Sequence, residues 1–344
     1  MDTNALIDLV HEVQGQLWVD KVNETHRTGR LCQWVSTFHP DKLPCRLDGT
    51  FHHGAFNAGL KMVAMEVAAL GFIRDRITIP VPTIYVWGLA SSNPLGLSLF
   101  IMMDFINSVS LGDFFWDSSA DRPSRVMRED IYNCDVKSIY RQLVNFLFQI
   151  FKLDFDEIGS LLLPQTGVYN PILPQPLTFK LYSILQNGGR FAITTEYFQY
   201  IIRQDWEQLV HQLNLIINKY NAKNKYIYNC YKFKLICNDL SLANLIVCSK
   251  GDFTVVRVLL QDRPVNSIWD YEGKETPKLA IWYFKYLDIF VYVLEEEEGK
   301  MPGYKEREIS SLVKWLQASG SMWLYILLLS GFNNYCSFSF TRLC

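Results

Sequence analysis

The sequence predicts an α+β fold with two lobes, a small N-terminal lobe that combines strands with a helix and a larger, mainly helical C-terminal lobe. Two observations lead to this prediction. Strand-like runs next to an amphipathic helix precede residue 104, whereas helical periodicity dominates beyond it. The length of 344 residues also fits one large or two medium domains, because single cores stop growing at roughly 250–300 residues. We therefore expect a helical extension over 1–44, a small lobe over 45–104 and the helical lobe over 105–344.

Composition and charge restrict the function classes. The chain has 33 Lys and Arg against 35 Asp and Glu, which gives a formal net charge of −2. This balance argues against a nucleic-acid partner and against a membrane-surface role, both of which favour basic surfaces. Hydrophobic residues make up 49% of the chain, enough to form packed cores. The oligomeric state stays open.

The cysteines and the apolar segments bear on location. Eight cysteines are dispersed without a Cys-x-x-Cys pair, which predicts neither a zinc knuckle nor a disulfide framework. The first four residues lack the character of a secretory signal. The most apolar late stretch, 322–329, is shorter than the roughly 20 residues of a membrane-spanning helix. We expect a cytoplasmic protein with no membrane partner.

The small lobe is predicted to contain one helix followed by two strands. Between residues 60 and 76, apolar side chains recur at intervals of four and three residues, the pattern of an amphipathic helix: Val63, Val67, Leu70 and Ile73. Glu66 lies at the edge of this stripe. Prolines at positions 80 and 82 end the helix. Strand-like runs follow at Thr83–Trp87 and Leu97–Met103, separated by a turn-rich segment.

The C-terminal lobe is predicted to be helical except for one compact strand–loop–strand unit at Phe233–Val258. Helical periodicity covers Val136–Asp154, about Thr194–Lys219, and about 275–297, 306–319 and 321–334. The Glu295–Glu298 run ends one of these helices, and we expect it to face water without a chemical role.

The segment most suggestive of chemistry lies inside the strand–loop–strand unit, at 237–247. Apolar residues before Asp239 predict a strand that ends at this carboxylate, and Asn244 follows five positions later, just before a second apolar run. This is the Asp-x-x-x-x-Asn spacing of the kinase-type catalytic loop. There an Asp accepts the proton of the attacking hydroxyl, and an Asn oxygen holds magnesium on the phosphates. The alternative is an ordinary turn capped by Asx side chains.

Around this loop the sequence resembles the aminoglycoside phosphotransferase and choline-kinase-like family, particularly its divergent fungal-type branch. The resemblance covers roughly Cys45 to Phe340. The matching pieces come in family order: a phosphate-covering loop at Asp48–Asn57 with Gly54, a helix at Met65–Ile73 with Glu66, the Ile79–Pro82 break, a hinge strand at Leu99–Phe105 with Met103, and the loop Cys237–Asn244. Cys237 replaces the family's His, and Leu242 replaces its Pro.

The resemblance implies a protein-kinase-like two-lobed fold and transfer of a phosphoryl group from ATP, with Mg²⁺, to the hydroxyl of an unidentified small molecule. It makes Asp239 the catalytic base and Asn244 a magnesium ligand. It also assigns nucleotide binding to Gly54, to Met103 at the adenine, and to Glu66, which would order the nucleotide lobe.

Two expected groups are missing from the pattern. A strand should carry a Lys or Arg that pairs with Glu66 and holds the phosphates, but only eight residues separate Asn57 from Glu66. Two strands and a turn need about twelve. Lys61 is the nearest base, on what reads as the same helix as Glu66.

The second missing group is the metal-binding Asp that follows the strand after Asn244. Its expected position is Leu260, and the candidate substitutes are Asp262 and Asp270. The resemblance to the family resumes after each of the two missing segments. Two further interpretations therefore stand beside the enzyme: a non-catalytic, pseudokinase-like binding module, and an incomplete gene product that lacks two internal coding segments.

Overall fold

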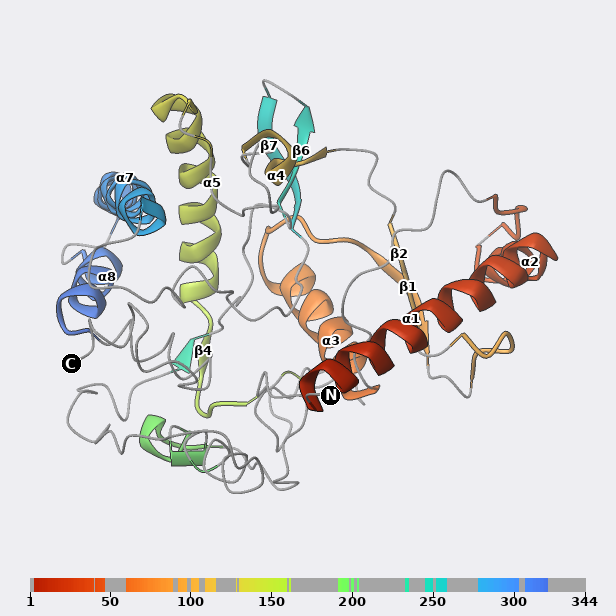
Figure 1. Ribbon diagram of the computed structural model, residues 1–344. Coiled ribbons are helices and arrows are strands. Elements are labelled where there is room, and N and C mark those ends of the chain that lie inside the picture. Colours follow the sequence, from red (N-terminus) through yellow and green to blue (C-terminus); the bar gives the residue numbers. More distant parts are fainter. Residues whose placement is uncertain are drawn as a thin grey trace. The chain divides into compact units, whose positions relative to one another are not determined.

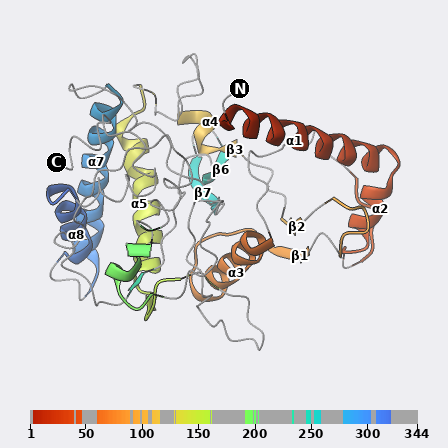
Figure 2. The ribbon, with the colours of Figure 1, turned by 60° about the horizontal axis from the view of Figure 1, so that its bottom comes forward.

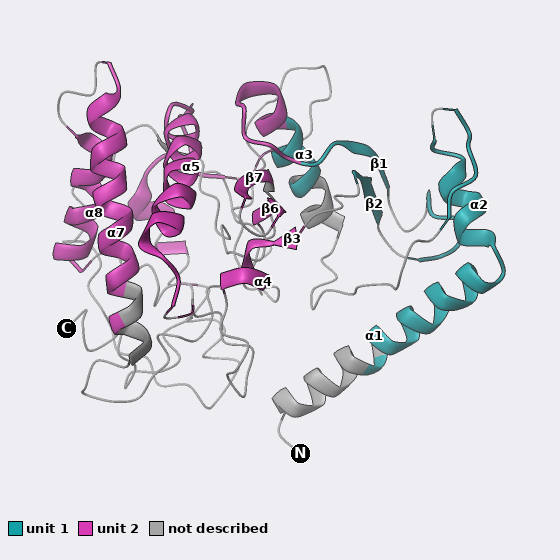
Figure 3. Ribbon diagram, turned by 90° about the horizontal axis from the view of Figure 1, so that it is seen from above, with its two compact units in different colours: residues 1–71, 82–105 teal, residues 72–81, 106–344 magenta. Residues whose placement is uncertain are grey.

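The computed structural model describes residues 3–39, 41–46, 60–88, 92–97, 100–104, 109–115, 128, 130–159, 161, 191–197, 199–200, 203, 233–234, 245–249, 252–258, 278–302 and 307–320. The chain divides into two compact units (Figure 3). Unit 1 comprises Met1–Gly71 and Pro82–Phe105, and unit 2 comprises Phe72–Val81 and Ile106–Cys344.

Unit 1 contains helices and one two-stranded sheet. Its helices are α1 (Thr3–Arg27), α2 (Arg30–Ser36) and the first part of α3 (Leu60–Arg76). Strands β1 (Ile84–Gly88) and β2 (Phe100–Met103) pair antiparallel, with Ile84 opposite Met103 and Gly88 opposite Phe100. The helix predicted over 60–76 is confirmed, and so are the two predicted strands, with other ends: the first covers Ile84–Gly88, and the second begins at Phe100 rather than at Leu97.

The N-terminal helices pack onto the segment that leads into β2. Val22 of α1 is buried with Leu95 and Leu97, and three partly buried side chains pack against this cluster: Trp18, Leu31 and Trp34. The Lys21 ammonium donates a hydrogen bond of 2.6 Å to the carbonyl of Gly96. Gly96 has a φ of 63°, which favours glycine, and a Cβ there would lie 2.8 Å from Lys21 Nζ. Residues 1–44 thus share a compact unit with the hairpin.

In its described part, unit 2 contains helices and two small antiparallel sheets (Figure 1). It contains the end of α3 and four further helices whose bounds the structure describes: α4 (Leu111–Phe115), α5 (Asn133–Phe151), α7 (Lys278–Lys300) and α8 (Glu308–Ala318). One sheet has the order β3–β6–β7, from Val109–Ser110, Leu245–Ser249 and Asp252–Val258. The other pairs β4 (Asp154–Phe155) with β5 (Phe233–Lys234).

The core of unit 2 lies between α5, α7 and α8, which stand side by side in Figures 1 and 2. One cluster of it is formed by five buried residues: Val144, Phe148, Val293, Leu294 and Ile309. The periodicity that predicted α5 is confirmed, because four of its apolar positions are buried: Ile139, Leu143, Phe146 and Ile150. Burial of this stripe, rather than local propensity, provides most of the stability of such a helix.

The described residues therefore form a mixed helix-and-strand structure with small antiparallel sheets, compatible with the α+β class. The helices predicted near 275–297 and 306–319 are α7 and α8. Of the helix predicted over Thr194–Lys219, residues 194–197, 199–200 and 203 are described and helical. The helix predicted at 321–334 lies outside the described residues. Within the described part of the chain, no helix combines the length and apolar character needed to cross a bilayer.

Candidate functional site

The predicted catalytic loop lies between two strands of unit 2. Strand β5 ends at Lys234, and β6 begins at Leu245, directly after Asn244. The described bounds of β6 agree with the strand expected after the Asp-x-x-x-x-Asn segment. Asp239 and Asn244 themselves lie outside the described residues, as do Asp262 and Asp270.

Strand β6 is the central strand of its sheet. Leu245 and Val247 have no exposed surface, and their burial anchors the strand. Leu245 lies opposite Val258 of β7, and Val247 lies opposite Val255. On its other edge, Val247 pairs with Val109 of β3. The strand that begins directly after the predicted loop is therefore held between two neighbouring strands.

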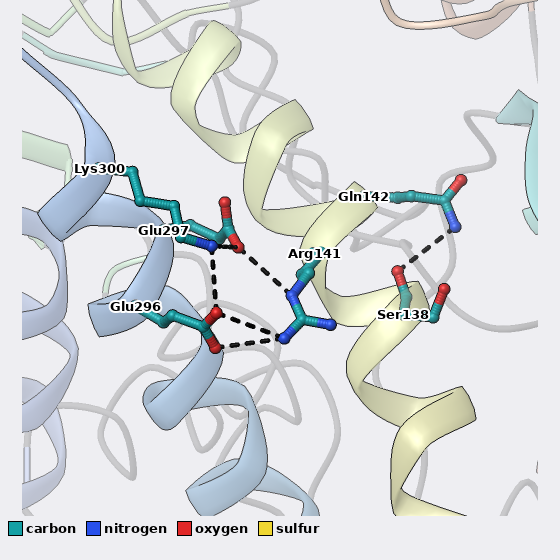
Figure 4. Close-up of polar contacts among 6 residues, drawn as sticks. All are labelled: Ser138, Arg141, Gln142, Glu296, Glu297 and Lys300. Carbon is teal, nitrogen blue, oxygen red and sulfur yellow. Dashed lines mark hydrogen bonds and ion pairs between the residues drawn. The ribbon is translucent and has the colours of Figure 1, made fainter.

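The outer edge of β7 is bonded to a side chain of α5. The Gln142 carboxamide donates a hydrogen bond of 2.9 Å to the carbonyl of Phe253 and accepts one of 2.8 Å from the amide of Val255. Its nitrogen also lies 3.4 Å from the carbonyl oxygen of Ser138, one turn earlier (Figure 4). The carboxamide takes the place of a peptide group from a further strand.

Two of the three nucleotide-binding candidates, Glu66 and Met103, are described residues of unit 1. Glu66 lies on α3 with a half-buried side chain, next to the buried Val67 and Ala68. Lys61 lies on the same helix. At 100° per residue, five positions place these two residues about 140° apart around the helix axis. Gly54, the third candidate in this part of the chain, lies outside the described residues.

Met103 is the last residue of β2, and 37% of it is exposed. The next residue, Asp104, connects the end of β2 to the start of β1 through hydrogen bonds. Its carboxylate accepts hydrogen bonds from the amide of Thr83, at 2.9 Å, and from the hydroxyl of Tyr85, at 2.6 Å. The hydrogen bond to the Asp104 carboxylate raises the pKa of Tyr85. The backbone at the predicted hinge is thus fixed from the β1 side.

The donor chemistry of the candidate metal ligands fits magnesium, because Asn244 and Asp262 carry carboxamide and carboxylate oxygens. Their geometry lies outside the described part of the chain. Among the residues that are described, no group of three or more His, Cys, Asp or Glu side chains could hold a metal ion.

The acidic run at the end of α7 forms ion pairs. Arg141 of α5 lies 3.2 Å from the carboxylate of Glu296 and 3.3 Å from that of Glu297, and Lys300 contacts both (Figure 4). The hydrogen bond from Lys300, and then the one from Arg141, lowers the pKa of Glu296. This network holds α7 against α5.

The expectation that the whole acidic run faces water is wrong for Glu298, which has no exposed surface. Its carboxylate accepts hydrogen bonds from the amides of Ile309 and Ser310, at 2.7 and 3.1 Å, and one of 2.6 Å from the Ser310 hydroxyl. These amides belong to the first turn of α8, where backbone amides have no acceptor within the helix. The helix dipole also favours a negative charge at this end. Glu298 caps α8 from α7.

Sequence reasoning missed both Gln142 and Glu298. Gln142 binds β7 across more than a hundred residues, and nothing next to it in the sequence signals this partner.

Comparison with known proteins adds no further candidates: no family model, no curated protein and no solved structure matches the chain.

Proposed function

We propose that the chain is an aminoglycoside-phosphotransferase-like protein with a protein-kinase-like two-lobed fold, built for phosphoryl transfer from ATP to the hydroxyl of a small molecule. The observation that supports it best is the Asp239-x-x-x-x-Asn244 spacing, which ends directly before β6. A buried central strand is a rigid support for a loop whose two polar groups must meet at one point.

In this proposal Asp239 accepts the proton of the acceptor hydroxyl as it attacks the terminal phosphorus. Asn244 and Asp262 would hold Mg²⁺, which neutralises phosphate charge when bound. Gly54 would lie in the loop that covers the phosphates, Met103 would contact the adenine, and Glu66 would order the nucleotide lobe. The acceptor is a small molecule with a free hydroxyl, and its class stays open because fold does not fix substrate. The oligomeric state also stays open.

A second candidate is a pseudokinase-like module that binds without catalysing transfer. The observation in its favour is the extent of α3, which begins at Leu60. Because residues 60–66 are helical, the eight positions between Asn57 and Glu66 have no room for a strand that carries a phosphate-binding lysine. Lys61 cannot approach Glu66 from an opposite strand. Loss of this base, and of a carboxylate at position 260, would remove most of the charge neutralisation on which transfer depends.

A cytoplasmic location is part of the proposal. The described cysteines Cys32, Cys45, Cys134 and Cys248 are free thiols, which fits a reducing compartment. No nucleic-acid or membrane partner is proposed, because the net charge is close to zero.

Thermal unfolding with and without ATP and Mg²⁺ tests nucleotide binding, since a ligand that binds the native state raises the midpoint. We expect a rise with millimolar MgATP that is reduced in Asn244→Ala, which loses a proposed Mg²⁺ ligand, and kept in Asp239→Asn, which loses only the proposed base. An unchanged midpoint of the wild-type chain would contradict the proposal. ADP formation in the presence of hydroxyl compounds then separates the enzyme from the binding module, which binds MgATP without forming ADP.

A further inference from the structure

Gln142 is placed between two parts of unit 2. It lies in the middle of α5, a long helix that is packed in the core through Val144 and Phe148. Its neighbour Arg141 points in another direction, toward the acidic residues of α7 (Figure 4). Adjacent positions of α5 therefore bond to α7 on one side and to β7 on the other, so α5 is a fixed support for both.

The two hydrogen bonds of Gln142 restrain β7 in both position and register. The carbonyl of Phe253 and the amide of Val255 project from the same edge of the strand, and the carboxamide bonds to both. A shift of β7 by one residue would turn these groups away from Gln142. Because Val247 lies opposite Val255, the restraint passes directly to β6.

β6 in turn sets the end point of the predicted loop. Asn244 is bonded covalently to Leu245, the first residue of β6, whose side chain is fully buried. A change in the position of β7 would thus move the residue to which Asn244 is attached. We infer that Gln142 is a positioning residue, which acts through the β6–β7 hairpin on the loop that carries Asp239 and Asn244. The inference rests on the proposed function.

The same helix supplies a matched control. Gln149 lies seven residues after Gln142 on α5 and also uses its side-chain carbonyl to accept hydrogen bonds across a long sequence distance. Its partners are the amide and the hydroxyl of Thr78, at 2.7 and 2.9 Å. Gln149→Leu therefore removes these two hydrogen bonds, and a local one of 2.7 Å to Asn145, from the same helix without touching β7.

The experiment compares the full-length wild-type chain with Gln142→Leu and Gln149→Leu. Three quantities are measured: the thermal midpoint, the hydrogen-exchange rate of the Val255 amide, and the MgATP concentration for half-maximal binding, which is obtained from the dependence of the midpoint on MgATP concentration. We expect both variants to lower the midpoint. Only Gln142→Leu should accelerate exchange at Val255. It should also raise the half-maximal MgATP concentration about tenfold, a change of the size expected when one hydrogen bond to a charged group is lost.

Each result supports or contradicts the inference. If Gln142→Leu exchanges faster at Val255 but keeps the wild-type half-maximal concentration, the inference is wrong and the proposed function stands. If the wild-type midpoint does not respond to MgATP, both are wrong. Should Gln142→Leu fail to fold, Gln142→Glu replaces it, since a carboxylate still accepts from Val255 but opposes the Phe253 carbonyl. The same two criteria then apply.

Discussion

Glu298 is a carboxylate without exposed surface whose hydrogen-bonding partners all come from the start of α8. Arg307, the residue at the N-cap position of that helix, has a left-handed backbone with a φ of 47° and makes no side-chain cap bond. The cap comes instead from α7. At the residue scale, Glu298 is therefore the part of the acidic run with the largest expected effect on stability.

We predict that Glu298→Ala lowers the free energy of unfolding by about 3 kcal/mol, because two buried amides lose a charged acceptor. Denaturant titration at neutral pH measures the change. Glu297→Ala is the control, since Glu297 is partly exposed and its pairs with Arg141 and Lys300 are at the surface. It should cost less than about 1 kcal/mol. Equal effects of the two substitutions would show that the buried Glu298 stabilises the fold no more than the partly exposed Glu297 does.

The ion pairs of Glu296 predict a dependence on pH. Lys300, and then Arg141, holds the pKa of Glu296 below its usual range. A lowered carboxyl pKa stabilises the fold above the pKa of the unfolded chain, and this contribution is lost as pH falls through the folded pKa. In Lys300→Gln the pKa of Glu296 should rise, which NMR titration of the side-chain carboxyl carbon measures. The stability difference from wild type should disappear in acid. An unchanged pKa of Glu296 would rule out this coupling.

At the element scale, α7 packs against both α5 and α8. Leu294 has no exposed surface and packs with the core residues of α5 and α8. Ile281, on the same helix, is 57% exposed. The two positions differ in burial while their side chains have the same number of carbons.

Leu294→Ala should therefore lower the free energy of unfolding by about 3 kcal/mol, through lost burial and the remaining cavity. Ile281→Ala should change it by less than about 0.5 kcal/mol. Urea denaturation measures both. A small effect of Leu294→Ala would mean that α7 does not pack in this register.

Elements with a strong local pattern could be predicted from the sequence. The stripe of α5 and the strands beside Pro80 and Pro82 depend on residues a few positions apart, and periodicity reports such spacing directly. The capping of α8 and the bonding of β7 to Gln142 could not be predicted, because their partners lie 11 to 113 residues apart. For the candidate site, the sequence supplies residue types and spacing, and the structure adds the strand that follows Asn244. The side chains of Asp239 and Asn244 lie outside the described residues, so their roles stay predictions.

At the scale of the whole molecule, the chain forms two compact units, and the candidate residues divide between them. Glu66 and Met103 belong to unit 1, whereas Asp239 and Asn244 belong to unit 2. The sequence gaps fall in the same two parts, one before Glu66 and one after β7. A loss of coding segments would therefore affect unit 1 and unit 2 separately, and with them the proposed nucleotide-binding residues and the proposed catalytic loop.

This leads to a prediction about the gene product. If two coding segments are missing, transcripts across the codons for residues 57–61 and 258–260 should include a longer form, which sequencing of the transcripts detects. The longer chain should be more soluble, because a lost strand leaves an unpaired sheet edge, and MgATP should raise its thermal midpoint more. Transcripts that contain no additional coding sequence at either position would exclude this interpretation.

The capping of α8 by Glu298 also determines which segment of the chain can be transferred to another protein as an intact unit. Because the acceptor for the first turn of α8 lies on the preceding helix, the information that starts α8 is encoded some ten residues upstream of it. A graft of residues 308–318 alone would leave this information behind, whereas a graft of 278–318 would carry it. The two helices thus form one transferable unit.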